Sequence, residues 1–422
     1  MSARTETRAR VLTWSAITAT AFVLALVAQA VYTRDPHWGV RWLADLWVYD
    51  ATGHAVRDGQ SLYDVVVMSP LYGPMPYLYP PLTAVLFFTP LTFLPFGVAG
   101  LLWNTATLVA LGAVVWITLG VAGVRGTGRR TVLTVAGLAL VFCLLPTRIH
   151  LIFGQINAFV FLLVLLDFRR GAGRWRGAGI GVAAALKVTP LIFVAYLLVT
   201  GQWKAARTAV LAFVAAVAAG FAVAPADSLK YWGGLVFESS RAGSVFGTPN
   251  QSLAAVLARV LHNGTFAIWW LVVLAMVAVL GLAVARYVHH RGSDFLGFCA
   301  AALTGLLVSP VSWEHHWVAV IPLLVWLAMR AYERRSAALA AVTAVLTAAF
   351  TLRVFWWVGV PEFPPAPMAL TAGQQLASSM MPLAALLLLL LGPLWVRRQF
   401  SPAPPAAVAE PLPAREVEVP VS

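Results

Sequence analysis

Long apolar runs separated by short polar segments occupy almost the whole chain. A transmembrane helix needs about 20 mostly apolar residues to cross roughly 30 Å of hydrocarbon. The runs that approach this length predict membrane spans at about 11–32, 98–123, 131–147, 157–168, 176–188, 189–201, 206–224, 265–287, 294–309, 317–331, 336–357 and 379–396. The pattern therefore predicts an all-α polytopic membrane protein with about 12 transmembrane helices.

The basic residues between the runs predict how the helices are oriented. Cytoplasmic loops of membrane proteins carry an excess of Lys and Arg. With the spans above, the basic clusters all fall on the side of the N-terminus: Arg125/Arg129/Arg130, Arg169/Arg170/Arg174/Arg176, Lys204/Arg207, Arg286/Arg291, Arg330/Arg334/Arg335 and Arg397/Arg398. We therefore expect a multi-pass protein of the plasma membrane with both termini cytoplasmic and a first external loop at about 33–81. These clusters account for the formal net charge of +13 without nucleic-acid binding.

Two segments do not fit a simple crossing. Residues 82–97 are apolar but contain Pro90 and Pro95, and a full crossing there would reverse the sides of the later basic clusters. We expect a partial or re-entrant helix. Residues 177–200 carry Lys187 near their middle, and the charge pattern favours two short helices that meet at 187–190, where Pro190 removes a backbone donor.

The composition indicates one membrane domain. The chain has 422 residues, of which 60% are hydrophobic and 11% charged, which argues against two or three soluble domains. Residues 1–400 are expected to form this domain. The Pro-, Ala- and Glu-rich residues 401–422 cannot bury a core and are expected to form a disordered cytoplasmic tail.

Carboxylates are scarce, and half of the Asp residues gather within one short stretch of the first external loop. The chain has eight Asp, and four of them lie between positions 45 and 64. Asp45 precedes Tyr49 by four residues, so the two share one face of an amphipathic interfacial helix. A carboxylate held there is placed for proton transfer at the membrane surface. A plain solvated carboxylate at headgroup level is the alternative, and Asp50 fits a solvated or turn-capping role better.

Other polar residues fall on the same external side. Lys187 is the hardest to explain structurally, because a lysine at mid-depth costs roughly 2.5–3.5 kcal/mol on insertion scales and indicates a partner or an anionic ligand. Gln155 and Asn157 fit either a site or a polar turn that caps the next helix. The remaining candidates on this side are Arg148, Asn250, Glu314, His315 and His316.

The His pair is the second strongest signal. Adjacent helical residues point about 100° apart, so one of His315 and His316 is expected to face a site while the other packs, and the sequence leaves open which. A metal site would need further convergent ligands, and the sequence does not show that Glu314 or Asp45 supplies them. A phosphate or sugar contact is therefore favoured, and neither a metal nor a cofactor is expected.

These segments together resemble a known family. The motifs are Asp45-Leu46-Trp47-Val48-Tyr49, Gly59-Gln60-Ser61-Leu62-Tyr63, Tyr79-Pro80-Pro81-Leu82, Gly154-Gln155-Ile156-Asn157, Ala185-Leu186-Lys187-Val188-Thr189-Pro190 and Ser309-Pro310-Val311-Ser312-Trp313-Glu314-His315-His316. In their order along the chain and in their common position on the external side, these motifs resemble those of the actinobacterial α-1,2-mannosyltransferases of the GT-C superfamily. The resemblance covers roughly residues 40–320. That family uses polyprenyl-phosphate-mannose, and its members extend phosphatidylinositol mannosides or branch lipomannan and lipoarabinomannan.

The resemblance implies a GT-C glycosyltransferase fold with short external-loop helices, formed by residues 1–400 as the catalytic domain. It implies a catalytic base at Asp45, with Asp50 as the rival. Loops 225–264 and 358–375 are expected to shape the acceptor site. Donor phosphate or sugar contacts are expected from Lys187, His315, His316, Arg148, Gln155 and Asn157, with Tyr49, Glu314 and Asn250 as secondary candidates.

The implied reaction is an inverting transfer of mannose from polyprenyl-phosphate-mannose to a 2-hydroxyl of a phosphatidylinositol mannoside on the periplasmic face, a step of cell envelope biosynthesis. Cationic groups would stabilise the departing phosphate, so no metal is needed. Alternatives are another lipid-linked sugar such as arabinose or glucose, or a lipomannan or lipoarabinomannan acceptor. A transporter or flippase of lipid-linked sugars is a further alternative, although it would need polar groups accessible from both sides.

Overall fold

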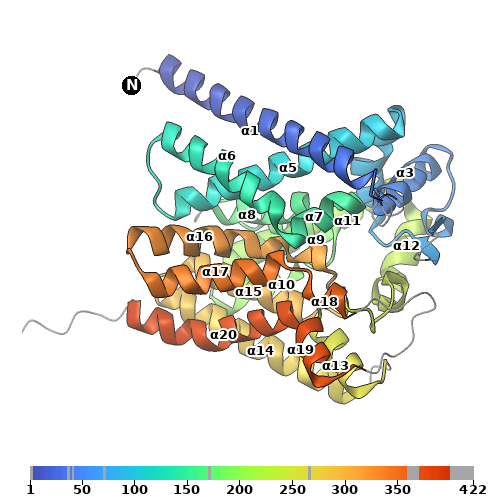
Figure 1. The fold of residues 1–422 in the computed structure, drawn as a ribbon. Coiled ribbons are helices and arrows are strands. Elements are labelled where there is room, and N and C mark those ends of the chain that lie inside the picture. Colours follow the sequence, from blue (N-terminus) through green and yellow to red (C-terminus); the bar gives the residue numbers. More distant parts are fainter. Residues whose placement is uncertain are drawn as a thin grey trace, which may run out of the picture.

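The computed structural model describes residues 3–35, 39, 42–69, 73–169, 173–264, 268–358 and 370–399. Within these ranges the chain is a bundle of helices that lie roughly along one direction (Figure 1). One antiparallel hairpin accompanies them, formed by β1 (Val66–Ser69) and β2 (Gly73–Pro76), with Val66 opposite Pro76. The predicted tail at 401–422 lies outside the described residues.

The long helices confirm a membrane protein. Among the described residues, five helices are individually long and apolar enough to cross a membrane. A sixth span exists if α6 (Thr127–Cys143) and α7 (Leu145–Phe153), bent by 76°, are counted as one. The number of twelve crossings stays a prediction. The five long helices are α1 (Ala3–Tyr32), α5 (Phe96–Val121), α11 (Trp203–Val223), α14 (Ile268–His290) and α20 (Met380–Gln399).

The other predicted spans coincide with shorter helices. They are α8 (Asn157–Arg169), α9 (Ala178–Leu186), α10 (Leu191–Val199), α15 (Asp294–Val308), α16 (Ile321–Glu333) and α17 (Ala337–Thr351). At 1.5 Å per residue, a nine-residue helix such as α9 covers only about 14 Å. These helices pack against longer or neighbouring ones: α9 against α11, α15 against α14, and α16 against α5 and α17.

The local structure of the two irregular segments, 177–200 and 82–97, agrees with the prediction from the sequence. Helix α9 ends at Leu186 and α10 begins at Leu191, with the backbone of Lys187 extended between them (φ −154°, ψ 128°). Residues 81–93 form a short helical run of α4 (Pro81–Thr83), η2 (Ala84–Phe88) and η3 (Thr89–Phe93). This run is too short to cross a bilayer, and its depth in the membrane stays a prediction.

Short connecting elements gather at the end of the bundle away from the N-terminus. Figure 1 shows α3, α12, α13 and α19 there, at the right-hand side. The connecting elements are α3 (Ala44–Arg57), η1 (Leu62–Asp64), α12 (Pro225–Gly233), η4 (Leu235–Phe237), η5 (Ser239–Ala242), α13 (Leu253–Leu261), η6 (Glu314–Val320), α18 (Val354–Trp357) and α19 (Ala372–Ser378).

Helix α3 is held against the turn that follows α7. The backbone N–H of Leu43, just before α3, donates to the carbonyl of Ile152. Gly154 ends α7 in the left-handed region (φ 70°), and a Cβ added there would lie 2.8 Å from the Cβ of Leu46. Only glycine satisfies both conditions without displacing α3. The turn at 154–157 therefore sets the position of α3 and of Asp45 on it.

The expected topology predicts different accessibility for two open glycines. A Cβ added at Gly128 or Gly373 meets no atom within 4 Å, so both sites accept cysteine. In a Cys143→Ala background, Gly373→Cys should react with an impermeant maleimide from outside intact cells. Gly128→Cys should react only after permeabilisation. External labelling of Gly128→Cys would contradict a cytoplasmic 125–130 loop.

Candidate active site

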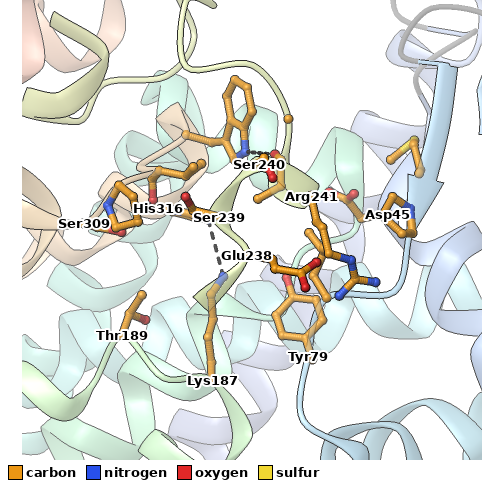
Figure 2. A pocket seen from close by; sticks show the side chains of 18 of the residues that line it. Asp45, Tyr79, Lys187, Thr189, Glu238, Ser239, Ser240, Arg241, Ser309 and His316 are labelled. Carbon is orange, nitrogen blue, oxygen red and sulfur yellow. Dashed lines mark hydrogen bonds between the residues drawn. The ribbon is translucent and has the colours of Figure 1, made fainter. Parts of the chain in front are cut away.

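A large cavity opens among the connecting elements. Its volume is about 2320 Å³, more than twice the roughly 300–1,000 Å³ of typical small-ligand pockets. Figure 2 shows Asp45, Tyr79, Lys187 and His316 around it. The cavity is also lined by Gln155, His315, Glu314, part of the β hairpin and much of the segment 235–249. It therefore has room for more than one substrate.

Asp45 lies in the first turn of α3, partly buried at the cavity wall. The side-chain amide of Gln155 donates a short hydrogen bond to Asp45 Oδ2. Burial raises the pKa of Asp45 to about 7, and the Gln155 hydrogen bond and the charge of Lys187 act in the opposite direction. A carboxylate with a pKa near neutrality is suited to general-base catalysis.

Gln155 connects Asp45 to two further side chains. Its Oε1 accepts from the hydroxyl of Tyr79 at 3.3 Å and from Nδ2 of Asn157 at 3.2 Å. The Tyr79 hydroxyl in turn accepts from the hydroxyl of Tyr49 at 2.9 Å. Tyr49 is 2% exposed and stacks on Phe88 with ring centroids 4.0 Å apart. The network is thus anchored in the core beneath the cavity.

Lys187 continues the network from the break between α9 and α10. Its Nζ donates to Asn157 Oδ1 at 2.6 Å and lies 3.4 Å from Nε2 of His316. It also lies 5.1 Å from the centroid of the Tyr79 ring, a cation–π distance. One hydrogen-bonded chain therefore runs from Asp45 through Gln155, Asn157 and Lys187 to His316.

Both histidines line the cavity, and only His316 joins this chain. His315 is 5% exposed, its ring lies 5.7 Å from that of Phe153, and neither ring nitrogen has a hydrogen-bond partner among the described residues. Burial lowers the pKa of both histidines well below its usual range, so both are neutral at pH 7. Buried ring nitrogens without a protein partner beside a cavity are consistent with a ligand contact.

The structure places three candidates outside the cavity lining. Arg148 Nη2 donates to the carbonyl of Thr351 at 2.9 Å. Asp50 lies 3.9 Å from the ring of His54. Asn250 is fully buried, and its Oδ1 accepts from the N–H of Ser312 at 3.0 Å. Arg148 therefore has no support as a phosphate contact, and Asn250 holds the loop beneath the His pair. A predicted position on the external side therefore does not determine where a side chain points.

Glu314 and two residues that sequence reasoning missed also line the cavity. Glu314 is 3% exposed, and its backbone N–H donates to the carbonyl of Pro249 at 3.1 Å. Tyr79 belongs to the motif Tyr79-Pro80-Pro81-Leu82, but the sequence alone predicts no role for its side chain. Arg241 lies in the loop 225–264, which the sequence predicts to be external. A basic residue in such a loop departs from the positive-inside bias, and this departure is the signal that could have pointed to Arg241.

Known proteins identify the family. Residues 77–310 match the sequence profile of glycosyltransferase family 87. The chain belongs to glycosyltransferase family 87. The matched range contains Tyr79, Gln155, Asn157 and Lys187, whereas Asp45 and the His pair lie outside it.

Curated relatives of this family 87 protein occur in mycobacteria. It is 33% identical over 332 residues to the polyprenol-phosphate-mannose-dependent α-(1-2)-phosphatidylinositol mannoside mannosyltransferase of Mycobacterium tuberculosis, covering 75% of this chain and 76% of the relative. Its identity to the protein of the same name from Mycolicibacterium smegmatis is 36% over 322 residues, covering 71% and 73%. A pentamannoside mannosyltransferase of M. smegmatis is 32% identical, covering 72% and 74%. No solved structure shows significant similarity to the chain.

Removal of the Tyr79 hydroxyl should destabilise the protein. In Tyr79→Phe the buried Tyr49 hydroxyl loses its acceptor, so the free energy of unfolding should fall by about 1–3 kcal/mol. Denaturant unfolding in detergent measures this. Tyr332→Phe is the matched control, because Tyr332 is 70% exposed and should change stability by less than about 0.5 kcal/mol. Equal stability of the two variants would contradict the buried network.

Proposed function

We propose that the protein is an integral-membrane inverting glycosyltransferase. It moves mannose from polyprenyl-phosphate-mannose to a 2-hydroxyl of a phosphatidylinositol mannoside. The observation that carries this proposal is the hydrogen-bonded chain from a carboxylate, Asp45, to a cation, Lys187, along one cavity wall. The names of the mycobacterial relatives support the donor, the acceptor and the linkage.

Asp45 serves as the base at one end of this chain. The acceptor hydroxyl loses its proton to Asp45 as its oxygen attacks the anomeric carbon of the donor. The bond from that carbon to the phosphate oxygen breaks at the opposite face, and the β-linked donor gives an α-linked product. The released group is polyprenyl phosphate. By analogy with glycoside chemistry, the carboxylate also stabilises positive charge that develops on the sugar.

Lys187 and His316 serve the departing phosphate at the other end. A cation near the phosphate stabilises negative charge that grows as the bond breaks. His316 lies 3.4 Å from the Lys187 ammonium and helps to position it, and the neutral His315, whose ring nitrogens have no partner among the described residues, adds a hydrogen bond to a phosphate oxygen or to the sugar. Because a lipid phosphate is already a competent leaving group, these side chains suffice for the proposed step.

The proposal includes a GT-C fold with twelve crossings, both termini cytoplasmic and the cavity open to the periplasm. Its support is the gathering of the cavity-lining elements at the end of the bundle away from the N-terminus (Figure 1). The basic clusters predicted to be cytoplasmic belong to the opposite ends of the helices, as the positive-inside bias requires.

The direct test is transfer by the purified protein in lipid. Polyprenyl-phosphate-mannose and GDP-mannose are supplied separately with a mannosylated phosphatidylinositol acceptor, and the product is detected by mass spectrometry. We expect product from the lipid donor alone. Product from neither donor, with folded protein, would contradict the proposal, and labelled mannose that crosses the bilayer without a new covalent bond would indicate transport.

The base assignment predicts a large effect of one substitution. Asp45→Asn keeps the size of the side chain but cannot accept the proton, so kcat should fall by about 10²- to 10⁴-fold. Asp50→Asn is the matched control, because Asp50 lies on the same helix outside the cavity lining. Radiolabelled transfer assays compare the two. Near-normal turnover of Asp45→Asn would reject the assignment.

The raised pKa predicts the pH profile. Asp45 accepts a proton only when ionised, and with a pKa of about 7 it is protonated at lower pH. We expect kcat/KM to fall about tenfold per pH unit below pH 7, as Asp45 becomes protonated. Gln155→Leu removes the hydrogen bond that lowers this pKa, so its midpoint should move to higher pH. A profile that is flat down to pH 5 would contradict Asp45 as the base.

A further inference from the structure

A second part of the cavity wall takes no part in the chain from Asp45 to His316. It is the segment 238–244, with the sequence Glu-Ser-Ser-Arg-Ala-Gly-Ser, and all seven residues line the cavity. The segment includes η5 and carries three hydroxyls, one carboxylate and one guanidinium. Figure 2 shows Glu238, Ser239, Ser240 and Arg241 in the same close view as Tyr79 and Asp45.

Arg241 is held in place but keeps donors for a ligand. Its Nη2 donates to the carbonyl of Tyr77 at 3.1 Å, and its guanidinium carbon lies 5.7 Å from the centroid of the Tyr63 ring. The ion pairs among the described residues do not include Arg241. A guanidinium has five N–H groups, so most of its hydrogen-bonding capacity remains for the cavity.

The segment is fixed to the loop that carries the His pair. The indole Nε1 of Trp313 donates to the carbonyl of Ala242 at 3.2 Å. Gly243 has a φ of 109°, and a Cβ there would lie 2.9 Å from Cζ2 of Trp313. Glycine is therefore required both for the backbone conformation and for the close approach of the indole ring. This part of the wall is a built surface positioned relative to His316.

We propose that the segment 238–244, centred on Arg241, binds the sugar residues of the acceptor that precede the one receiving mannose. This inference rests on the proposed function and names a specificity subsite within it. Serine hydroxyls both donate and accept, as sugar hydroxyls require, and the donors of Arg241 match sugar oxygens. The carboxylate of Glu238 can accept from a sugar hydroxyl but would repel a phosphate, which favours sugar over a lipid phosphodiester at this wall.

Two tyrosines, Tyr77 and Tyr79, connect the proposed subsite to the proposed base. The ring of Tyr77, whose carbonyl holds Arg241, lies 6.0 Å from the ring of Tyr79. Tyr79 is bonded to Gln155, which holds Asp45. Tyr77 itself is fully buried beneath the wall, whereas Tyr79 lines the cavity. An oligosaccharide bound at Arg241 would thus extend along the wall to Tyr79 and bring its terminal hydroxyl to Asp45. Binding of the inner sugars then favours the reacting geometry.

Kinetics with a graded series of acceptors tests this subsite. The full-length protein in lipid vesicles receives polyprenyl-phosphate-mannose and acceptors with one, two or three mannoses on the same alkyl chain. Arg241→Ala should raise the acceptor KM about tenfold or more for two and three mannoses, and leave the one-mannose acceptor and the donor KM nearly unchanged. Arg241→Lys, which keeps the charge but not the fork of donors, should be intermediate.

Arg57→Ala is the matched control. Arg57 also donates to a backbone carbonyl, that of Thr92 at 3.2 Å, and lies 4.5 Å from the centroid of the Phe93 ring. It does not line the cavity, so its loss should leave all acceptor KM values unchanged. A comparison of the two variants separates loss of a ligand contact from loss of a similar structural contact.

Three results would overturn the proposal. One is an equal loss with every acceptor, or a raised donor KM, in Arg241→Ala. Another is a loss seen only when the acceptor carries phosphoinositol, which would assign Arg241 to a phosphate. The third comes from binding of free trimannoside, measured calorimetrically without donor. Arg241→Ala should weaken this binding at least tenfold, and unchanged binding would reject the subsite. Trimannoside binding without any transfer would instead reject the proposed function alone.

Discussion

The side chain of Gln155 links the two ends of the candidate site, the carboxylate of Asp45 and the cation of Lys187, and so fixes their separation. Its amide nitrogen donates to Asp45, and its carbonyl oxygen accepts from Tyr79 and Asn157. An amide offers donors at one end and an acceptor at the other, so it can join a carboxylate to further donors. Asn157 repeats this arrangement toward Lys187. The carboxylate and the cation are therefore positioned by side chains that are themselves buried and bonded, as a preorganised site requires.

Helix breaks provide the backbone from which this site is built. Non-helical backbone at membrane depth is tolerated only where it is buried in protein or lines a water-filled cavity. The breaks at 154–157 and 187–190 both supply residues to the cavity wall. Each break also directs polar side chains, which are unfavourable against lipid, toward the cavity. The irregular backbone at the two breaks thus supplies polar residues of the cavity wall.

Much of the fold and part of the site could be predicted from the sequence. Apolar runs gave the helix positions, because burial in lipid or protein requires apolar side chains along each helix. The break at 187–190 followed from the pattern of basic clusters together with Pro190. Five predicted residues do converge in one hydrogen-bonded chain, because short polar motifs between apolar runs fall on one side of the bundle. They are Asp45, Gln155, Asn157, Lys187 and His316.

The rest depended on contacts between distant parts of the chain. Sequence places Arg148 on the external side, but its direction is set by the carbonyl of Thr351, 203 residues away. Tyr79 acquires its role from Gln155, 76 residues further on, and Arg241 from Tyr77, 164 residues before it. The number of crossings also stays open, because helices of nine to fifteen residues do not reveal by length whether they span a bilayer.

The proposed roles of Lys187 and His316 follow from how charge changes during the reaction. A mannosyl phosphodiester carries one negative charge, whereas the released phosphate monoester approaches two. His316 is neutral because burial lowers its pKa, so Lys187 is the side chain at this end of the hydrogen-bonded chain that can carry positive charge. Its attraction for the phosphate grows as the bond to the sugar breaks. An interaction that strengthens toward the transition state raises kcat as well as binding, which is the form of stabilisation that accelerates the chemical step.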